Sequence, residues 1–374
     1  MSAPEVAEVA PEVAGRLGRL RPLLAEAGVD ALVVTTAANV RYLTGFSGSA
    51  GVLVVTAGSA VLTSDGRYRT QAAEQLQAAG TGDAVALVIG GSDAQRTAAL
   101  DALRAGAVQR VGLEADTVTW AAQRRWADAL DAADTVPTTG LVERLRLVKD
   151  AGELARMGTA ASIADRALAE VLPMLAEGRT EREIALALDS AMRRLGAEDR
   201  AFETIVAGGP NSAKPHARPS DRPVGPGEPV VIDFGATVDG YRSDMTRTFC
   251  VGGSPAPELA RIFDVVADAQ AAGVAAVRAG VPTGEVDRAC RETIAAAGWA
   301  EAFEHGTGHG VGLDVHEAPS VAPGGTAILG PGTVVTVEPG VYLAGIGGVR
   351  IEDTVVVSED GCRSLTGFTK DIVA

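Results

Sequence analysis

The stretch Val230-Val-Ile-Asp-Phe-Gly-Ala-Thr-Val-Asp239-Gly240-Tyr-Arg-Ser-Asp-Met-Thr-Arg-Thr-Phe249 decides the fold of the second half of this 374-residue chain. Two segments rich in β-branched and aromatic residues flank an Asp-Gly pair, which is the favoured sequence for a two-residue hairpin turn. We therefore predict a β-hairpin in which Val238 faces Tyr241 across the turn.

The register of this hairpin brings two aspartates together. Counting outward from the turn, Asp233 faces Thr246 and Asp244 faces Gly235. Side chains alternate between the two faces of a sheet, so the two aspartates share one face as diagonal neighbours, roughly 7 Å apart at the backbone. A turn longer or shorter by one residue would place them on opposite faces.

Two later segments carry glutamates in a similar pattern. Residues 333–338 (Thr-Val-Val-Thr-Val-Glu) alternate as a strand that ends at Glu338, before a Pro-Gly break. Residues 347–357 predict the next strand, and within it Arg350 and Glu352 are two positions apart and should point the same way.

The chain has only four histidines, which are His216, His305, His309 and His316. Imidazole is a common metal ligand and the usual proton carrier near neutral pH, so a cluster of three indicates a site. Glycine occupies every second position from 306 to 312. We expect His305, Thr307 and His309 to share a face while another backbone packs closely against the glycines.

Each of these features alone has an ordinary structural explanation. A hairpin aspartate is commonly a surface residue, Glu338 could protect a sheet edge, and the glycine run lacks the spacing of a dinucleotide-binding or phosphate-binding loop. Together they predict a metal site. Two carboxylates about 4 Å apart repel by roughly 4 kcal/mol at an effective dielectric of about 20, so four of them need protons or cations. Four carboxylates and one imidazole suit a pair of Mn²⁺, Co²⁺, Fe²⁺ or Zn²⁺ ions, which can activate a bridging water and polarise a carbonyl group.

We divide the chain into a loose N-terminal tail of residues 1–15, a first domain of residues 16–146 and a second domain of residues 147–374. In the first domain, short apolar runs alternate with helical patterns, which predicts a layered α/β domain. The strand-like runs are residues 30–35, 51–56, 60–63, 85–89 and 110–113, and the helical patterns are residues 68–79, 94–104 and 118–132.

The second domain begins with two helix start signals. Asp150-Ala-Gly-Glu153 and Thr180-Glu-Arg-Glu183 each have the spacing of a capping box, so we expect a helix after each. Helical patterns return over residues 258–278 and 284–297, and strand-like segments follow each pair of helices. This order predicts an α+β domain built from two related halves.

Composition and charge exclude several classes of protein. A net charge of −15 opposes binding to nucleic acid and suits a cationic partner. Residues 1–14 contain no basic segment, so we expect no secretory peptide. Residues 42–64 and 318–337 lack charge but are broken by glycine or proline, so we expect no membrane span. Three cysteines without metal-type spacing indicate free thiols in a cytoplasmic protein.

These segments resemble the pita-bread metallopeptidases. The matching positions are Asp233 and Asp244 in the hairpin, His309 in His-Gly-Thr-Gly-His-Gly-Val-Gly-Leu-Asp-Val-His-Glu, Glu338 in Thr-Val-Glu-Pro-Gly-Val-Tyr, and Glu352 in Gly-Val-Arg-Ile-Glu-Asp. The chain is similar to the Xaa-Pro peptidases, meaning aminopeptidase P and prolidase.

The first domain resembles the creatinase-type N-terminal domain. Asn39-Val-Arg-Tyr-Leu-Thr-Gly-Phe-Ser-Gly and Ser64-Asp-Gly-Arg-Tyr68 carry this resemblance. With the second domain it covers nearly the whole chain after residue 15. It implies a mixed sheet with helices, followed by an α+β pita-bread domain with a pseudo-twofold repeat.

The resemblance also implies a role for each of the five matching residues. Asp233 would bind one metal ion, while His309 and Glu338 would bind the other. Asp244 and Glu352 would bridge the two ions, and Glu338 would also take the proton from the bridging water.

Four further residues match positions around the site in that family, and a fifth residue is singled out by the hairpin register. His305 and His316 match substrate-contacting histidines, and His216 matches their partner across the cleft. As donors they would steady the tetrahedral intermediate and hold the proline side of the scissile bond. Arg350 resembles an arginine that orients neighbouring acids. Thr246, which faces an aspartate in the predicted hairpin, is expected to support the ligands from behind.

The implied function is a cytoplasmic exopeptidase with two divalent metal ions, Mn²⁺ first and Co²⁺, Fe²⁺ or Zn²⁺ as alternatives. It would hydrolyse the Xaa-Pro bond at the N-terminus of peptides, and an Xaa-Pro dipeptidase is the alternative. The expected partners are a proline-containing peptide and a second copy in a homodimer, without nucleic acid or membrane. Two remoter alternatives are a metal-independent creatinase-like amidinohydrolase and a non-catalytic binding homologue. Relatives of both kinds have lost residues of the set that is intact here.

Overall fold

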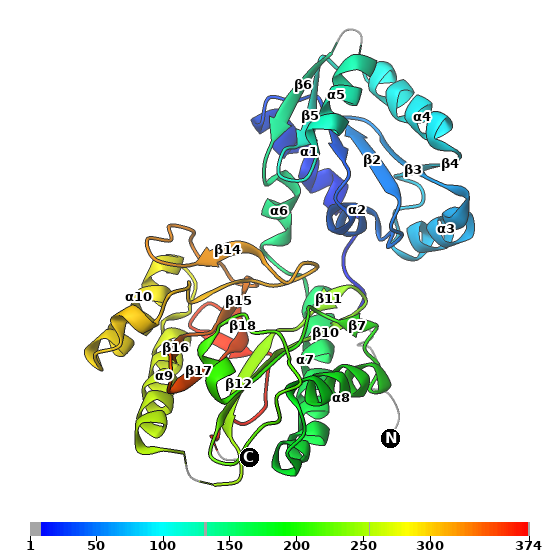
Figure 1. The fold of residues 1–374 in the computed structure, drawn as a ribbon. Coiled ribbons are helices and arrows are strands. Elements are labelled where there is room, and N and C mark those ends of the chain that lie inside the picture. Colours follow the sequence, from blue (N-terminus) through cyan, green and yellow to red (C-terminus); the bar gives the residue numbers. More distant parts are fainter. Residues whose placement is uncertain (1–8, 131–132, 254, 373–374) are drawn as a thin grey trace. The chain divides into compact units, whose positions relative to one another are not determined.

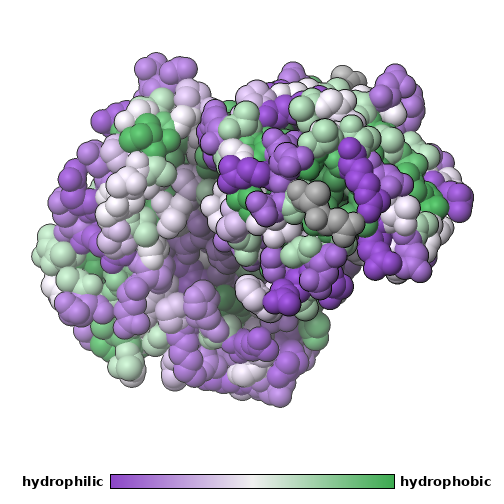
Figure 2. All heavy atoms as spheres, turned by 90° about the horizontal axis from the view of Figure 1, so that it is seen from above, coloured by the Kyte–Doolittle hydropathy of each residue, from purple (hydrophilic) through white to green (hydrophobic). Residues whose placement is uncertain are grey.

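The computed structural model describes residues 9–130, 133–253 and 255–372, which divide into two compact units (Figure 1). The first unit is Pro11–Arg146, and the second comprises Val9, Ala10 and the described chain from Leu147 onward. Both hydrophilic and hydrophobic residues are exposed on the face shown in Figure 2. Among the described residues, no helix combines the length and the apolar character needed to cross a membrane.

A mixed six-stranded sheet with helices forms the first unit. Its strands are β1 (Ala31–Val34), β2 (Gly51–Thr56), β3 (Ala60–Ser64), β4 (Ala86–Ile89), β5 (Arg110–Glu114) and β6 (Asp134–Thr138). Its helices are α1 (Arg16–Glu26), α2 (Ala37–Thr44), the 3₁₀ helix η1 (Gly66–Tyr68), α3 (Arg69–Ala78), α4 (Ser92–Ala105), α5 (Trp120–Ala129) and α6 (Leu141–Arg146). The strand order is β4-β3-β2-β1-β5-β6, with β2 antiparallel to β1 and β3 and the remaining pairs parallel.

The predicted strands and helices of this unit are confirmed, with small differences at their ends. Residues 131–132 of one predicted helix, and residues 1–8 of the predicted tail, lie outside the described residues. The prediction lacked β6, because Pro137 weakens the strand pattern there. Proline is tolerated at the edge of a sheet, and β6 is an edge strand.

One buried carboxylate in the first unit is completely paired. Glu114, at the end of β5, accepts hydrogen bonds at Oε2 from the backbone N–H groups of Thr35 (2.7 Å) and Thr36 (2.9 Å), and from both of their hydroxyls. Its Oε1 accepts from Asn39 Nδ2 at 2.7 Å. Thr36 precedes α2, so this carboxylate fixes the start of that helix.

The helices of the second unit come in two pairs. They are α7 (Ala151–Val171), α8 (Glu181–Arg194), α9 (Pro257–Ala276) and α10 (Thr283–Ala296), with the 3₁₀ helices η2 (Leu172–Glu177), η3 (Gly209–Ala213) and η4 (Ala300–Ala302). Both predicted capping boxes are present at the starts of α7 and α8. Each satisfies backbone N–H groups that the first turn of a helix leaves without partners.

The strands of the second unit follow the helix pairs. The first set is β7 (Asp199–Arg200), β8 (Ile205–Gly208), β9 (Pro229–Phe234), β10 (Ala236–Val238), β11 (Tyr241–Arg242) and β12 (Met245–Cys250). The second set is β13 (Gly308–Gly310), β14 (Glu317–Val321), β15 (Val334–Val337), β16 (Gly340–Leu343), β17 (Gly347–Arg350), β18 (Asp353–Val357) and β19 (Cys362–Ser364). One hydrophobic core joins α7 and α8 to the first set, and another joins α9 and α10 to the second, so the predicted two halves are confirmed (Figure 1).

The predicted register is confirmed, although the hairpin divides into two ladders in different sheets, β9 with β12 and β10 with β11, and the predicted pair of Asp244 and Gly235 falls at the break between them. Val238 pairs with Tyr241, and Asp233 pairs with Thr246. Asp239 and Gly240 have φ angles of 46° and 73°, both in the left-handed region that this kind of two-residue turn requires. The turn therefore has the predicted length, which sets the face on which Asp233 and Asp244 lie.

One predicted strand is wrong in its extent. Residues 347–357 form two strands, because β17 pairs with β16 whereas β18 pairs with β15 in a different sheet. Glu352 lies in the break between them. The change of sheet leaves its side chain in the same cavity as that of Arg350.

Candidate active site

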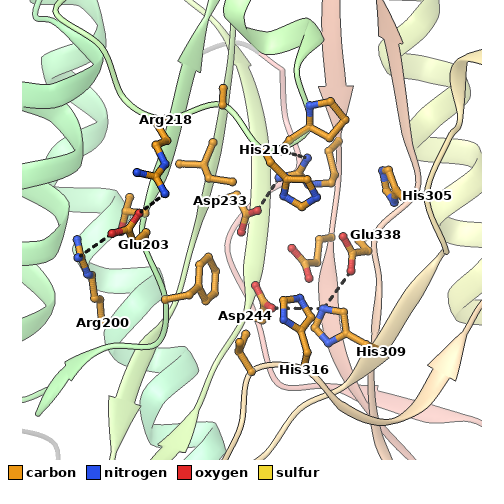
Figure 3. A pocket seen from close by; sticks show the side chains of 18 of the residues that line it. Arg200, Glu203, His216, Arg218, Asp233, Asp244, His305, His309, His316 and Glu338 are labelled. Carbon is orange, nitrogen blue, oxygen red and sulfur yellow. Dashed lines mark hydrogen bonds and ion pairs between the residues drawn. The ribbon is translucent and has the colours of Figure 1, made fainter.

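A cavity of about 740 Å³ in the second unit gathers nearly all of the predicted site residues (Figure 3). They reach it from β9, β12 and its preceding loop, β13, the end of β15 and the β17–β18 break. The predicted residues that line it are His216, Asp233, Asp244, His305, His309, His316, Glu338, Arg350 and Glu352. Thr246 is fully buried behind them.

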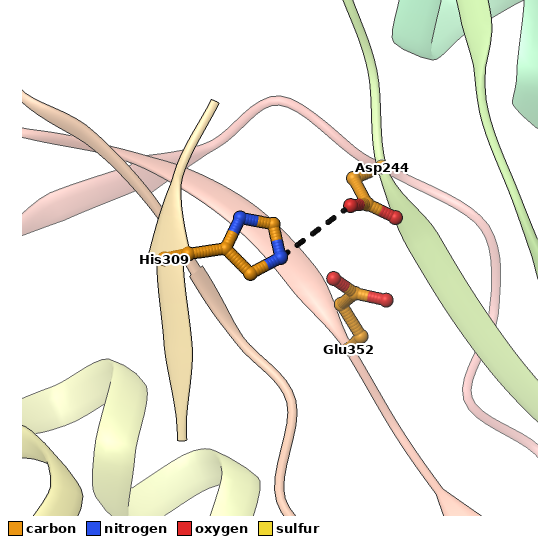
Figure 4. A group of neighbouring side chains, drawn as sticks. All are labelled: Asp244, His309 and Glu352. Carbon is orange, nitrogen blue, oxygen red and sulfur yellow. Dashed lines mark ion pairs between the residues drawn. The ribbon is translucent and has the colours of Figure 1, made fainter. Parts of the chain in front are cut away.

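Three of these side chains form a group with the geometry of a metal site (Figure 4). One ligand atom from each of Asp244, His309 and Glu352 lies within 4.8 Å of the others, which is close enough to hold one metal ion. His309 Nε2 is 3.8 Å from Asp244 Oδ2. His309 Nδ1 lies 3.0 Å from the carbonyl oxygen of Gly310, so that nitrogen carries the proton and Nε2 faces the acids.

Glu338 joins this group from the end of β15. Its Oε1 lies 3.2 Å from His309 Nε2 and accepts a hydrogen bond from Thr336 Oγ1 at 3.1 Å. Its backbone N–H donates to the carbonyl of Thr307 at 2.8 Å. The closeness of these two strands requires a glycine, because a Cβ at Gly308 would lie 2.1 Å from the carbonyl oxygen of Thr336. The expectation that a backbone packs against the glycines is confirmed there.

Arg350 connects two of the acids, Asp233 directly and Glu352 through Thr246. Its Nη2 donates to Asp233 Oδ2 at 2.5 Å, and its Nε donates to Thr246 Oγ1 at 3.1 Å. Thr246 Oγ1 in turn donates to Glu352 Oε2 at 2.6 Å. One arginine and one hydroxyl therefore hold Asp233 and Glu352 in place, as the predicted positions of Arg350 and Thr246 suggested.

The electrostatics of this group call for positive charge. Burial, followed by the charge of Glu352, raises the pKa of Asp244 well above its ordinary value. Burial, followed by the charge of Glu338, does the same for Glu352. Among the described side chains, Asp233 Oδ1 and Glu352 Oε1 are buried without a hydrogen-bond partner. Leaving buried oxygens without a partner costs free energy, and carboxylate oxygens are ligands of hard divalent cations. The acids of this cavity therefore fit such ions.

His305 is held by a residue that the sequence did not single out. Tyr342 Oη lies 2.9 Å from His305 Nε2 and accepts a hydrogen bond from Arg350 Nη1 at 2.8 Å. His305 Nδ1 lies 2.8 Å from the carbonyl oxygen of Gly306, which can only accept. His305 therefore carries its proton on Nδ1, and its Nε2 accepts from the Tyr342 hydroxyl. Burial lowers the pKa of His305 and raises that of Tyr342 to about 12, so both groups are neutral near pH 7.

The two remaining histidines face the same cavity from different loops (Figure 3). The ring centroid of His316 lies 4.2 Å from that of His309. Burial, followed by the charge of His309, lowers the pKa of His316. His216 is exposed and lies next to Pro215 and buried Ala217. The structure thus brings all four histidines of the chain to one cavity.

The predicted common face of His305, Thr307 and His309 is wrong for Thr307. Its hydroxyl donates to Asp287 Oδ1 of α10 at 2.9 Å and is buried away from the cavity. Asp287 also accepts from the backbone N–H of Thr307, at 3.2 Å. The Asp287 carboxylate draws the loop toward α10 before β13 begins. The alternation of side chains between two faces therefore starts later along the chain than the sequence suggested.

Two protein-family models match the chain. The model of metallopeptidase family M24 matches residues 155–359, and the creatinase/prolidase N-terminal domain model matches residues 16–148. This chain belongs to metallopeptidase family M24. It is an enzyme of the metallopeptidase class with a pita-bread catalytic domain, and the family implies divalent metal ions and a peptide substrate.

Relatives within the family cover nearly the whole chain. An uncharacterised peptidase, YqhT of Bacillus subtilis, is 40% identical over 96% of this chain and 99% of its own length. The solved structure of an Xaa-Pro dipeptidase from Bacillus anthracis is 38% identical, with a TM-score of 0.91 over 96% of this chain and 98% of that one. The structure of an X-Pro aminopeptidase from Thermotoga maritima is 35% identical, with a TM-score of 0.86 over 96% and 99% of the two chains. These similarities extend through both units.

Proposed function

We propose that this member of family M24 hydrolyses the Xaa-Pro bond at the N-terminus of peptides. The observation that carries the proposal is the presence of Asp233, Asp244, His309, Glu338 and Glu352 around one cavity. Relatives named as Xaa-Pro dipeptidase and X-Pro aminopeptidase support the choice of substrate. The residue before proline would bind beside the acids, whereas proline would bind near the histidines.

We propose that the cavity holds two divalent metal ions, with Mn²⁺ first and Co²⁺, Fe²⁺ or Zn²⁺ as alternatives. Asp233 would bind one, His309 and Glu338 the other, and Asp244 and Glu352 would bridge them. The oxygen-rich donor set favours hard cations, and the unpaired oxygens of Asp233 and Glu352 fit this use. When bound, such ions supply Lewis acidity and lower the pKa of a water molecule.

The chain's own residues would then move the proton and hold the substrate. Glu338 would accept the proton of the attacking water, for which its place on the cavity wall at the end of β15 is suited. His216 and His316 would donate hydrogen bonds toward the oxyanion. His305 has both nitrogens engaged, so we assign its ring face, rather than an N–H group, to contact with proline.

We place an aminopeptidase ahead of a dipeptidase. The cavity of about 740 Å³ continues past the proposed ligands along Phe202, Glu203 and Arg218, which leaves room for a substrate longer than two residues. We further propose action in the cytoplasm, a homodimer, and a boundary between the two domains at residues 146 and 147. Gel filtration with light scattering tests the homodimer.

A pair of peptides tests the proposed function. Ala-Pro and Ala-Pro-Ala are incubated with Mn²⁺-loaded enzyme, with Ala-Ala-Ala as the control that lacks proline. We expect release of alanine from both proline peptides, faster from the tripeptide, and none from the control. Equal cleavage of Ala-Ala-Ala would contradict the proposal, and cleavage of Ala-Pro alone would establish the dipeptidase. Activity that survives exhaustive chelation would favour the creatinase-like alternative, and no hydrolysis of any peptide would favour a binding protein.

A further inference from the structure

A buried ion pair adjoins, through the chain, a residue that lines the cavity, and it lies outside the set of proposed ligands. Lys149 Nζ is 2.7 Å from Glu317 Oε1, and the two side chains are only 1% and 6% exposed. Lys149 precedes α7, whereas Glu317 begins β14 and directly follows His316. The pair therefore connects the start of the catalytic unit to the loop that carries a proposed substrate-contacting histidine.

The lysine end of this pair is anchored through its backbone. The N–H of Lys149 donates to the carbonyl of Gly332 at 2.9 Å, and the neighbouring Val148 forms a bridge with Thr333. Thr333 leads into β15, the strand that ends at Glu338. Lys149 is thus fixed to the same strand that presents one of the acids of the site.

The glutamate end is folded under the histidine loop. Glu317 pairs with Gly310 in the β13–β14 ladder, just beyond the irregularity that follows His309. Its carboxylate packs against Gly312, where an added Cβ would lie 2.4 Å from Oε1. The glycine at 312 therefore leaves the space that this carboxylate occupies.

His316 itself has little to hold it. In the part of the chain that the structure describes, its ring makes no hydrogen bond, and its close aromatic neighbour is His309, 4.2 Å away between centroids. The place of the ring then depends on the backbone at 316, which the adjoining Glu317 fixes. Buried ion pairs contribute little net stability compared with apolar side chains of similar size, so the pair needs another explanation.

We propose that Lys149 and Glu317 are positioning residues that hold His316 over the catalytic cavity. This inference rests on the proposed function for its kinetic consequence, but not for its geometric one. Loss of the pair lets the His316 loop move while the acids and His309 stay in place, because Thr336 and the β13–β15 pairing hold His309 independently. A misplacement of about 1 Å at such a group can cost roughly 100-fold in rate.

The first experiment separates positioning from stability. Glu317→Gln alone leaves a buried cation and should lower the melting temperature, whereas the double variant Lys149→Met/Glu317→Gln removes both charges and should recover it. We expect the double variant to retain its metal content and to lose roughly 10- to 100-fold in kcat/KM for Ala-Pro-Ala. The control is Glu170→Gln, which breaks the exposed pair with Arg194 between α7 and α8. It should change neither the melting temperature nor kcat/KM. Recovery of full activity together with stability in the double variant would overturn the proposal.

A second measurement does not depend on catalysis. With four histidines in the chain, the imidazole signals in a ¹H–¹⁵N spectrum of the zinc-loaded protein are few enough to assign by single His→Gln variants. We expect the His316 signals to shift in the double variant while those of His216 and His305 stay. Unchanged His316 signals would overturn the proposal. If the wild-type enzyme cleaves no Xaa-Pro peptide, the proposed function fails, and this comparison still tests the positioning.

Discussion

Buried carboxylates in the two units differ in how completely their oxygens are hydrogen-bonded. In the first unit, Glu114 receives hydrogen bonds at both carboxylate oxygens from Thr35, Thr36 and Asn39. In the second unit, Asp233 and Glu352 each keep one buried oxygen that no described residue pairs. The first arrangement is complete without any further component, and it fixes a helix start. We propose that cations complete the second arrangement, so that Glu114 serves the fold whereas Asp233 and Glu352 serve the chemistry.

The largest effect should come from Glu338. In Glu338→Gln the side chain keeps its shape but can no longer accept a proton, so we expect kcat for Ala-Pro-Ala to fall by about 10³-fold or more. Steady-state kinetics at saturating Mn²⁺ measure this loss. The matched change in the other group, Glu114→Gln, should leave kcat of the folded enzyme unchanged. A comparable loss of kcat in both variants would remove the distinction between the two groups.

Metal should stabilise the protein more strongly as pH rises. The pKa values of Asp244 and Glu352 are raised in the metal-free protein, so their contribution to stability is present at low pH and is lost as pH rises through those values. Bound cations remove that loss and compete with protons for the same oxygens. At a metal concentration 1,000 times Kd the gain is about 4 kcal/mol.

Thermal unfolding with and without Mn²⁺ between pH 5 and 8 checks this dependence. We expect the difference in melting temperature to increase steadily with pH. Replacing Asp244 with asparagine should shrink the difference and raise the melting temperature of the metal-free form, because one buried like charge is gone. A metal effect that is largest at pH 5 would contradict the account.

Truncation of Glu114, the fully hydrogen-bonded carboxylate, should lower the stability of the protein and leave catalysis and metal binding unchanged. Glu114→Ala leaves the N–H groups at the start of α2 without their acceptor, so we expect a loss of about 2 to 3 kcal/mol in the free energy of unfolding. Urea denaturation followed by circular dichroism measures it. Bound metal and kcat/KM of the folded fraction should stay at the wild-type level. A drop in metal content would contradict the assignment of Glu114 to stability alone.

The smallest effect should come from Tyr342. In Tyr342→Phe the ring still packs, but His305 Nε2 and Arg350 Nη1 lose their shared hydroxyl. We expect kcat/KM to fall by about fivefold, equivalent to roughly 1 kcal/mol for one lost hydrogen bond. The loss should appear in KM for proline peptides because the His305 ring becomes freer to turn. A loss confined to kcat would assign the tyrosine to the chemical step instead.

The sequence predicts the hairpin half of the site well, for a local reason. Asp239 and Gly240 fix the turn length, and the turn length fixes the faces of all residues on both strands. The pairing of Thr246 with Asp233 follows from the same count. The local sequence is sufficient to predict the geometry where, as in this hairpin, a short segment determines it.

The rest of the site depends on contacts that are distant in sequence. The strand-like pattern over residues 347–357 gives no signal that its two ends join different sheets, as β17 and β18 do. Thr307 turns away because Asp287 of α10 accepts from it, and nothing near residue 307 indicates this. Tyr342 resembles an ordinary strand residue until Arg350 and His305 are placed beside it. Lys149 and Glu317 have no local pattern at all.

Metal content measured on protein purified without chelator tests the central claim most directly. Elemental mass spectrometry, normalised to protein concentration, should give two divalent ions per chain for the wild type and for Glu114→Ala. Asp244→Asn, which removes a proposed bridging carboxylate, should retain fewer. A wild-type protein that carries no metal, and that cleaves Ala-Pro-Ala at full rate in excess chelator, would contradict the assignment of the unpaired acids to cations.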